Sequence, residues 1–242
     1  MSEADVRVFP TLQGASEALA AEVARELIDA VEARERATIA LSGGSTPRPL
    51  HKILAAQHGE IPWDKVHIFW GDERFVPRDS EDSNYRMARE TLLDDIEIPD
   101  ENVHPWQTET GDPDVSALAM QMEMERVFGC TFVGELPPRF DVLLMGLGEN
   151  GHTASLFPNT PALQEARRWA IPSEATYEPR RRLTMTLPVL GAGRHIHFLV
   201  AGENKREALQ CALSGPSPDC PASLVVPADG TLTWWLDEEV AP

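Results

Sequence analysis

Three short polar segments of this chain carry residue types that bind anions or move protons. The first, 42–47 (SGGSTP), joins a predicted strand to a predicted helix. Its glycines let backbone N–H groups converge on an anion, and its hydroxyls and the helix N-terminus add further donors. A lone Gly-Gly is usually an ordinary tight turn, but the Ser-Thr-Pro that follows favours phosphate binding by Gly43, Gly44, Ser45 and Thr46.

The second segment, 146–151 (GLGENG), matches the dinucleotide fingerprint G-x-G-x-x-G. We expect no nicotinamide cofactor there, because the segment lies late in the chain and Pro158 and Pro161 end any following helix too early. His152 comes directly after these glycines, where an imidazole can act as a general base on a water molecule. The alternative interpretation is that His152 only caps the turn.

The third segment, Gly71-Asp72-Glu73-Arg74, ends another predicted strand. One of its charged side chains could bind or act on a substrate, while another forms a local salt bridge. Two further sources of positive charge are the run 180–182 (RRR) and Lys205, which opens a predicted helix. A run of like charges usually forms a solvated surface. The arginine run leads into a predicted strand, however, so at least one of its side chains could enter a cleft and bind phosphate.

The remaining histidines and serines indicate neither a metal site nor a serine nucleophile. Neither H-x-x-x-H nor H-E-x-x-H occurs, and the alternation of His195 and His197 on a predicted strand is only a weak sign of a ligand pair. Ser45 and Ser155 lack the G-x-S-x-G elbow. We therefore expect no metal, and a histidine-activated water as the nucleophile.

The order of strands and helices predicts how these segments are positioned. Apolar runs predict strands at 6–12, 38–42, 65–70, 140–147, 183–187, 195–201 and 232–236. Apolar spacing predicts helices at 18–34 (with Ser16 as N-cap), from Pro47 onward, and at 83–96, 114–128 (with Leu118, Met122 and Met124 in the core) and 205–213. Such alternation is typical of an α/β fold: a doubly wound, mostly parallel, Rossmann-like sheet with helices on both faces. We expect one domain over residues 1–242, with ligands bound outside the carboxyl ends of the strands, where all three segments lie.

The composition excludes several classes of partner. The 242 residues include 21 Lys and Arg against 39 Asp and Glu, a formal charge of −18 that repels phosphate polymers, so we expect no nucleic-acid partner. No apolar run approaches the roughly 20 residues that span a bilayer, so we expect no membrane partner. The first residues, MSEADVRVF, do not read as a signal peptide, and three scattered cysteines fit a reducing, cytoplasmic compartment. We expect the excess acid on the outer helices, as a solubility feature, at Glu17, Glu22, Glu26, Glu32, Glu35, Asp94 and Asp95.

Taken together, these segments resemble the glucosamine-6-phosphate isomerase/6-phosphogluconolactonase family, and within it the lactonases. The likeness runs nearly end to end through 41–47 (LSGGSTP), 71–77 (GDERFVP) with 83–85 (SNY), 146–158 (GLGENGHTASLFP), 182–188 (RLTMTLP), 202–205 (GENK) and the tail 234–240. The resemblance implies a sugar-phosphate isomerase type of fold and hydrolysis of the δ-lactone of 6-phosphogluconate in the oxidative pentose phosphate pathway. The resemblance implies that neither a metal nor a nucleotide cofactor is needed. We expect the small-molecule lactone as the binding partner, and a monomer or a homodimer as the oligomeric state.

By the same resemblance, His152 would activate the water and Arg74 would hold the substrate or the developing oxyanion. The phosphate and sugar would be held by Gly43, Gly44, Ser45, Thr46, Asp72, Gly148, Arg182 and Lys205. The family usually reads D-G-H where this chain has Asn150-Gly151-His152. Because asparagine can only hydrogen-bond, we expect a lower pKa for His152 than with aspartate, and activity largely retained.

Two other functions stay open. Glucosamine-6-phosphate deaminases resemble the glycine–histidine segment, but they need an acidic residue five positions after the histidine, where Phe157 stands. They also read D-E-Y where this chain has Asp72-Glu73-Arg74. A non-catalytic sugar-phosphate sensor on the same fold would tolerate loss of His152, but a regulator would normally carry a DNA-binding module, for which this chain has neither room nor charge.

Overall fold

The computed structural model describes residues 5–56, 60–131 and 136–242, in which strands and helices alternate. The strands are β1 (Asp5–Phe9), β2 (Ala37–Leu41), β3 (Val66–Trp70), β4 (Asp72–Arg74), β5 (Val142–Met145), β6 (Ala170–Glu174), β7 (Arg181–Met185), β8 (His195–Val200) and β9 (Thr231–Asp237). The α-helices are α1 (Leu12–Arg34), α2 (Arg48–Ala56), α3 (Asn84–Thr91), α4 (Pro113–Phe128), α5 (Leu187–Gly191) and α6 (Arg206–Leu213). Short 3-10 turns lie at η1 (Trp63–Lys65), η2 (Leu93–Asp95), η3 (Asp100–Asn102), η4 (Pro161–Gln164), η5 (Glu203–Lys205) and η6 (Pro221–Leu224).

Six strands form a parallel sheet in the spatial order β1-β9-β8-β5-β2-β3. From β2 the chain moves outward to β3, whereas from β5 it moves the other way to β8 and β9. The loops that follow β2 and β5 therefore diverge, and a crevice forms at such a switch point, outside the carboxyl ends of the strands. The predicted doubly wound sheet is confirmed.

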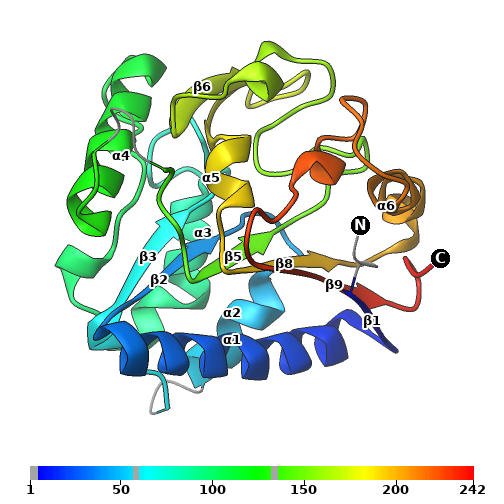
Figure 1. The fold of residues 1–242 in the computed structure, drawn as a ribbon, viewed down its shortest axis with the longest axis horizontal. Helices are drawn as coiled ribbons and strands as arrows, with labels where there is room; N and C mark the ends of the chain where they lie inside the picture. Colours follow the sequence, from blue (N-terminus) through cyan, green and yellow to red (C-terminus); the bar gives the residue numbers. More distant parts are fainter. Residues whose placement is uncertain (1–4, 57–59, 132–135) are drawn as a thin grey trace.

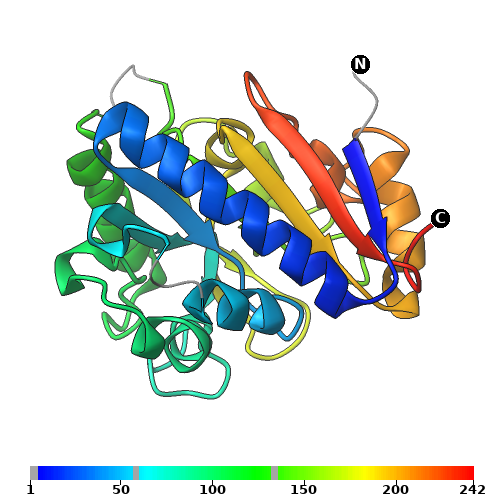
Figure 2. The ribbon, with the colours of Figure 1, turned by 90° about the horizontal axis from the view of Figure 1, so that it is seen from below.

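Helices cover both faces of this sheet. In Figure 1, α1 and α2 lie below it while α5 and α6 lie above it. Figure 2 shows α1 extending along the sheet in nearly the same line as β8 and β9. Its inner face buries Leu19, Val23 and Leu27, and all five residues of β2 are buried, as expected for a central strand covered on both sides.

A second, antiparallel sheet, β4-β7-β6, was not predicted from the sequence. β4 has only three residues and follows β3 after a single glycine, so it is too short to show an apolar alternation. Its register sets Asp72 opposite Thr184 and Arg74 opposite Arg182. Two charged segments that are far apart in the sequence thus become neighbours.

Two local predictions about helices were wrong. α1 begins earlier than expected because Thr11 caps it, its Oγ1 accepting a hydrogen bond from the N–H of Gly14 at 3.2 Å, while Ser16 is buried inside the helix and donates to the carbonyl of Leu12. On α4, Met124 is buried, but Leu118 and Met122 are 58% and 59% exposed. They lie four residues apart on the face that α4 turns away from the core.

Glu26 was expected on the surface but is buried on the inner face of α1. Its Oε2 accepts a hydrogen bond from Nε2 of His197 at 2.8 Å, and its Oε1 lies 3.1 Å from Nδ1 of His195. The indole N–H of Trp235 donates to Nδ1 of His197, which places the proton of that ring on Nε2, facing Glu26. The two histidines thus tie α1 to β8 through a carboxylate.

Residues 5–56, 60–131 and 136–242 contain no group of three or more His, Cys, Asp or Glu side chains placed to hold a metal ion. Within the same ranges, no helix is long and apolar enough to cross a membrane.

Candidate active site

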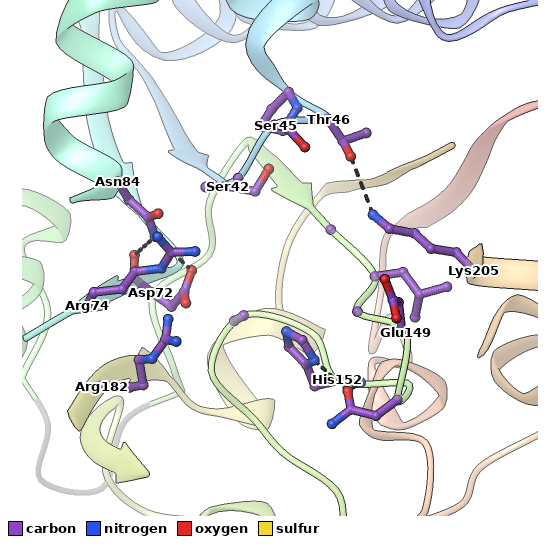
Figure 3. Close-up of a pocket in the computed structure, with 18 of the residues that line it drawn as sticks. Ser42, Ser45, Thr46, Asp72, Arg74, Asn84, Glu149, His152, Arg182 and Lys205 are labelled. Carbon is purple, nitrogen blue, oxygen red and sulfur yellow. Dashed lines mark hydrogen bonds between the residues drawn. The ribbon is translucent and has the colours of Figure 1, made fainter. Parts of the chain in front are cut away.

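A pocket of about 560 Å³ opens at the crevice between the loops after β2 and β5. Figure 3 shows side chains entering it from both loops, from the small sheet and from the segment before α6. The structure brings together every residue predicted for the site: Gly43, Gly44, Ser45, Thr46, Asp72, Arg74, Gly148, Asn150, His152, Arg182 and Lys205 all line it.

A tight turn after β5 holds His152 at the rim. The N–H of Gly148 donates to the carbonyl of His152 at 2.8 Å, and the N–H of Gly151 donates to the carbonyl of Gly148 at 2.9 Å. A Cβ on Gly148 would overlap the imidazole of His152. The glycine is therefore needed there so that the ring can lie against the backbone.

The hydrogen bonds of His152 define which ring nitrogen carries the proton. Oδ1 of Asn150 lies 2.6 Å from Nδ1 of His152 and also accepts from the backbone N–H of the same residue at 3.2 Å. Two donors on one oxygen support this orientation of the amide, so Nδ1 carries the proton and Nε2 keeps its lone pair.

The surroundings of His152 favour its neutral form. Burial lowers the pKa of His152 to about 4; the carboxylate of Asp72 acts in the opposite direction, while the charges of Arg182, Lys205 and Arg74 lower the pKa further. At neutral pH the ring is uncharged and can accept a proton at Nε2.

Two arginines face each other across the small sheet. Arg182 is buried and its Nε donates to the carbonyl of Pro179 at 2.6 Å, while Nη1 of Arg74 donates to the carbonyl of Asp82 at 2.6 Å. Burial and the charge of Arg74 lower the pKa of Arg182. Two neighbouring guanidinium groups lining one pocket, close to Asp72 (Figure 3), favour an anionic ligand.

Asp72 is held in place by two polar side chains. Its Oδ2 accepts from Oγ of Ser155 at 2.6 Å, and its Oδ1 accepts from Nδ2 of Asn84 at 3.3 Å. Ser155 is 1% exposed and its hydroxyl is occupied by this bond. A role for Ser155 as nucleophile is thereby disfavoured, in agreement with the sequence.

Glu73 points away from the pocket and caps α3. It accepts backbone N–H groups of Arg74, Asn84 and Tyr85 at 2.7–2.8 Å and the hydroxyl of Ser83 at 3.2 Å. Burial raises the pKa of Glu73 to about 7, although these hydrogen bonds oppose the rise. Instead of the salt bridge that the sequence suggested for this segment, Glu73 fixes the start of α3 beside Asp72.

The opposite wall combines Lys205 with the loop before α2. Nζ of Lys205 donates to Oγ1 of Thr46 at 3.4 Å, and burial lowers the pKa of Lys205 while Glu149 and Asp237 act against that shift. Gly44 has a φ of 92° and faces open space. Its conformation exposes the backbone next to the N-terminus of α2, as an anion site requires.

Several lining residues were not proposed as site residues from the sequence, and two of them, Asn84 and Tyr177, contact predicted ones. Asn84 begins α3 and fills the space left by the absent side chain of Gly43, where a Cβ would overlap its amide. Its signal was the serine before it, which caps the helix. Tyr177 lies in the turn between β6 and β7, with its hydroxyl 3.5 Å from Nε2 of His152. That turn has no motif, so only the folded chain reveals it.

Only one arginine of the run 180–182 lines the pocket. Arg182 does, whereas the guanidinium of Arg181 lies 4.6 Å from the ring centre of Phe75, and Arg180 is exposed. Arg181 and Arg182 point to opposite sides because successive side chains alternate along β7, and Arg180 lies before the strand begins.

Comparisons with known proteins show the family of this chain. Residues 10–234 match the model of the family described as glucosamine-6-phosphate isomerases/6-phosphogluconolactonase. The chain is 43% identical over 220 residues to a 6-phosphogluconolactonase of Synechocystis sp., covering 90% of this chain and 88% of that protein. It is 37% identical over 243 residues to a 6-phosphogluconolactonase of Mycobacterium bovis, covering 98% and 96%.

The fold agrees as well. The solved structure of a 6-phosphogluconolactonase from Trypanosoma cruzi superposes with a TM-score of 0.88 at 29% identity, covering 100% of this chain and 97% of that one. The chain belongs to the glucosamine-6-phosphate isomerase/6-phosphogluconolactonase family.

Proposed function

We propose that this protein hydrolyses 6-phospho-D-glucono-1,5-lactone to 6-phosphogluconate. The observation that carries the proposal is the arrangement of His152: its imidazole is neutral, Asn150 sets the tautomer so that Nε2 is unprotonated, and Arg74, Arg182 and Lys205 line the same pocket. A base next to several cations suits a substrate that has an electrophilic carbonyl at one end and a phosphate at the other.

In the proposed reaction, Nε2 of His152 removes a proton from water as the oxygen attacks the lactone carbonyl. The carbonyl electrons move onto oxygen, and Arg74 stabilises this oxyanion. When the tetrahedral intermediate collapses, the bond to the ring oxygen breaks and the imidazolium returns the proton to that oxygen. The products are a carboxylic acid, which ionises, and the hydroxyl of the opened ring.

The phosphate and sugar are held by the other lining residues. Lys205, Arg182, the hydroxyls of Ser45 and Thr46 and the backbone at Gly43 and Gly44 supply donors for anionic oxygens. Asp72 can accept from sugar hydroxyls, and Gly148 leaves room for the imidazole of His152. We include in the proposal that residues 1–242 act as one domain in the cytoplasm, as a monomer or homodimer without a nucleic-acid or membrane partner.

The deaminase alternative fits the pocket poorly. Phe157 stands where that activity needs an acidic residue, and its ring centre lies 4.8 Å from that of His152. An apolar ring at this place supplies no proton to an amine or an enol. It keeps the imidazole desolvated, which suits a neutral base.

Hydrolysis of freshly prepared lactone tests the proposal. The wild-type protein should accelerate hydrolysis above the uncatalysed rate, and His152→Ala should remove most of the excess, by about 100-fold or more for loss of a general base. Binding of 6-phosphogluconate to the variant, followed by calorimetry, reports whether the pocket is intact. Binding by the wild type without acceleration would instead identify a sugar-phosphate sensor.

A further inference from the structure

The turn between β6 and β7 places a second polar group at the nitrogen that acts as base. The hydroxyl of Tyr177 lies 3.5 Å from Nε2 of His152, and the residue is 46% exposed at the mouth of the pocket. Because Nδ1 of His152 carries the ring proton and binds Asn150, Nε2 is the acceptor in this contact and the hydroxyl of Tyr177 donates to it.

Two ring contacts and two hydrogen bonds of the surrounding turn hold Tyr177 in that position. Its ring meets the ring of Phe157 edge-on, with centres 6.0 Å apart, and the guanidinium of Arg182 lies 5.4 Å from its centre. Arg182 also binds the carbonyl of Pro179, and the N–H of Ala175 donates to the carbonyl of Arg180 at 2.8 Å, which closes the turn. The side chain is thus supported on two sides although its edge is open to solvent.

A water molecule that attacks a carbonyl must be oriented by more than its base. One O–H points to Nε2 and a lone pair must point to the carbonyl carbon, which leaves the second O–H to be fixed by an acceptor. A phenolic oxygen can accept such a bond. Among the described residues, Tyr177 is the hydrogen-bond partner of Nε2, and Asn150 is the partner of Nδ1.

We propose that Tyr177 is a catalytic residue that binds the attacking water together with His152. When water binds between the two groups, the hydroxyl turns from Nε2 and accepts a hydrogen bond from one O–H of the water while Nε2 accepts the other, so the oxygen lone pair is directed into the pocket. No proton is transferred to the phenol; the proton that leaves the water goes to Nε2 and then to the ring oxygen. This role rests on the proposed lactonase activity and adds to it the partner that orients the nucleophile.

Tyr177→Phe tests the hydroxyl while keeping the ring against Phe157 and Arg182. We expect kcat to fall by about 3- to 10-fold, as for loss of one neutral hydrogen bond, with KM and inhibition by 6-phosphogluconate within about twofold of wild type. Tyr85→Phe is the matched control, because the chain has two tyrosines and Tyr85 does not line the pocket. Its kcat should equal that of the wild type.

The double variant separates water binding from a structural effect. In a His152→Ala background, Tyr177→Phe should lower the residual rate by less than about twofold, because the water is no longer held at Nε2. An equal loss in both backgrounds, or a Tyr177→Phe enzyme with wild-type kcat, would overturn the role of Tyr177 while leaving the lactonase proposal intact. A wild-type protein without lactonase activity would overturn both.

Discussion

Oδ1 of Asn150 lies 2.6 Å from Nδ1 of His152, so the residue that supports the proposed base is a neutral amide. The amide fixes the tautomer but supplies no negative charge to stabilise the imidazolium. Burial and three nearby cations already lower the pKa of His152 to about 4. The proposed base is therefore ready to accept a proton over a wide range of pH.

This relationship predicts the pH dependence of catalysis. A base must be unprotonated to act, so kcat/KM of the wild type should stay level from neutral pH to about pH 5 and fall as the pH drops through about 4. In Asn150→Asp, a carboxylate beside Nδ1 stabilises the imidazolium and raises the pKa of His152. The acid limb should then move to higher pH by about one unit, with the plateau retained. Collapse of the plateau, with no displaced limb, would contradict this role of Asn150.

Gly148 should be needed for activity because of the space that it leaves. In Gly148→Ala the new Cβ would overlap the imidazole of His152, so we expect the ring to be displaced and kcat to fall by about 100-fold. Gly14→Ala is the control, since the nearest atoms to its would-be Cβ lie at 3.7 and 3.8 Å, an ordinary contact, and Gly14 does not line the pocket. Steady-state kinetics and circular dichroism of both variants test this. Equal rates in the two variants would show that the ring does not depend on Gly148.

Lys205 should act in substrate binding more than in the chemical step. Lys205→Gln removes one charge from the wall that carries Thr46 and the N-terminus of α2. Loss of one charge-assisted hydrogen bond to phosphate should raise KM by about 10-fold or more, with kcat changed much less. Lys52→Gln, an equal change on the exposed side of α2, should leave both parameters unaltered. A fall in kcat alone for Lys205→Gln would assign this lysine to the reacting end of the substrate.

His51 should make the fold sensitive to acid. Its ring is buried, Nδ1 lies 3.0 Å from the hydroxyl of Thr91, and burial followed by the charge of Arg48 lowers its pKa to about 4. In the unfolded chain His51 becomes protonated as the pH falls through about 6.5, whereas in the folded chain it stays neutral until about pH 4. The stability that neutral His51 contributes is therefore present above pH 6.5 and is lost as the pH falls toward 4.

Urea unfolding at pH 7.5 and pH 5 measures this loss. Between pH 7.5 and pH 5, we expect the free energy of unfolding of the wild type to fall by about 1–2 kcal/mol more than that of His51→Gln, because glutamine binds no proton in this pH range. For each protein the compared quantity is the change in the free energy of unfolding between pH 7.5 and pH 5. A destabilisation by the substitution that is equal at both pH values therefore does not affect the comparison. The same loss in both proteins would assign the acid sensitivity to other groups.

The sequence by itself determined the doubly wound architecture and the gathering of the polar segments at one edge of the sheet. Apolar periodicity and glycine positions are local properties, and parallel strands share one carboxyl edge, so the segments after β2, β3 and β5 had to converge. That convergence also explains how a chain with a formal charge of −18 presents Arg74, Arg182 and Lys205 in one pocket: net charge describes the whole chain, and topology decides where each sign lies.

Only the tertiary structure decided which side chains meet. The three-residue β4 has no pattern of its own, yet its pairing with β7 sets Arg74 opposite Arg182. The sequence predicts a surface position for Glu26, but in the fold its carboxylate contacts His197. Tyr177 lies in a turn without any motif, and only the fold places its hydroxyl next to His152. Such contacts, and the burial that lowers the pKa of His152, depend on residues distant in the chain, and local periodicity contains no information about them.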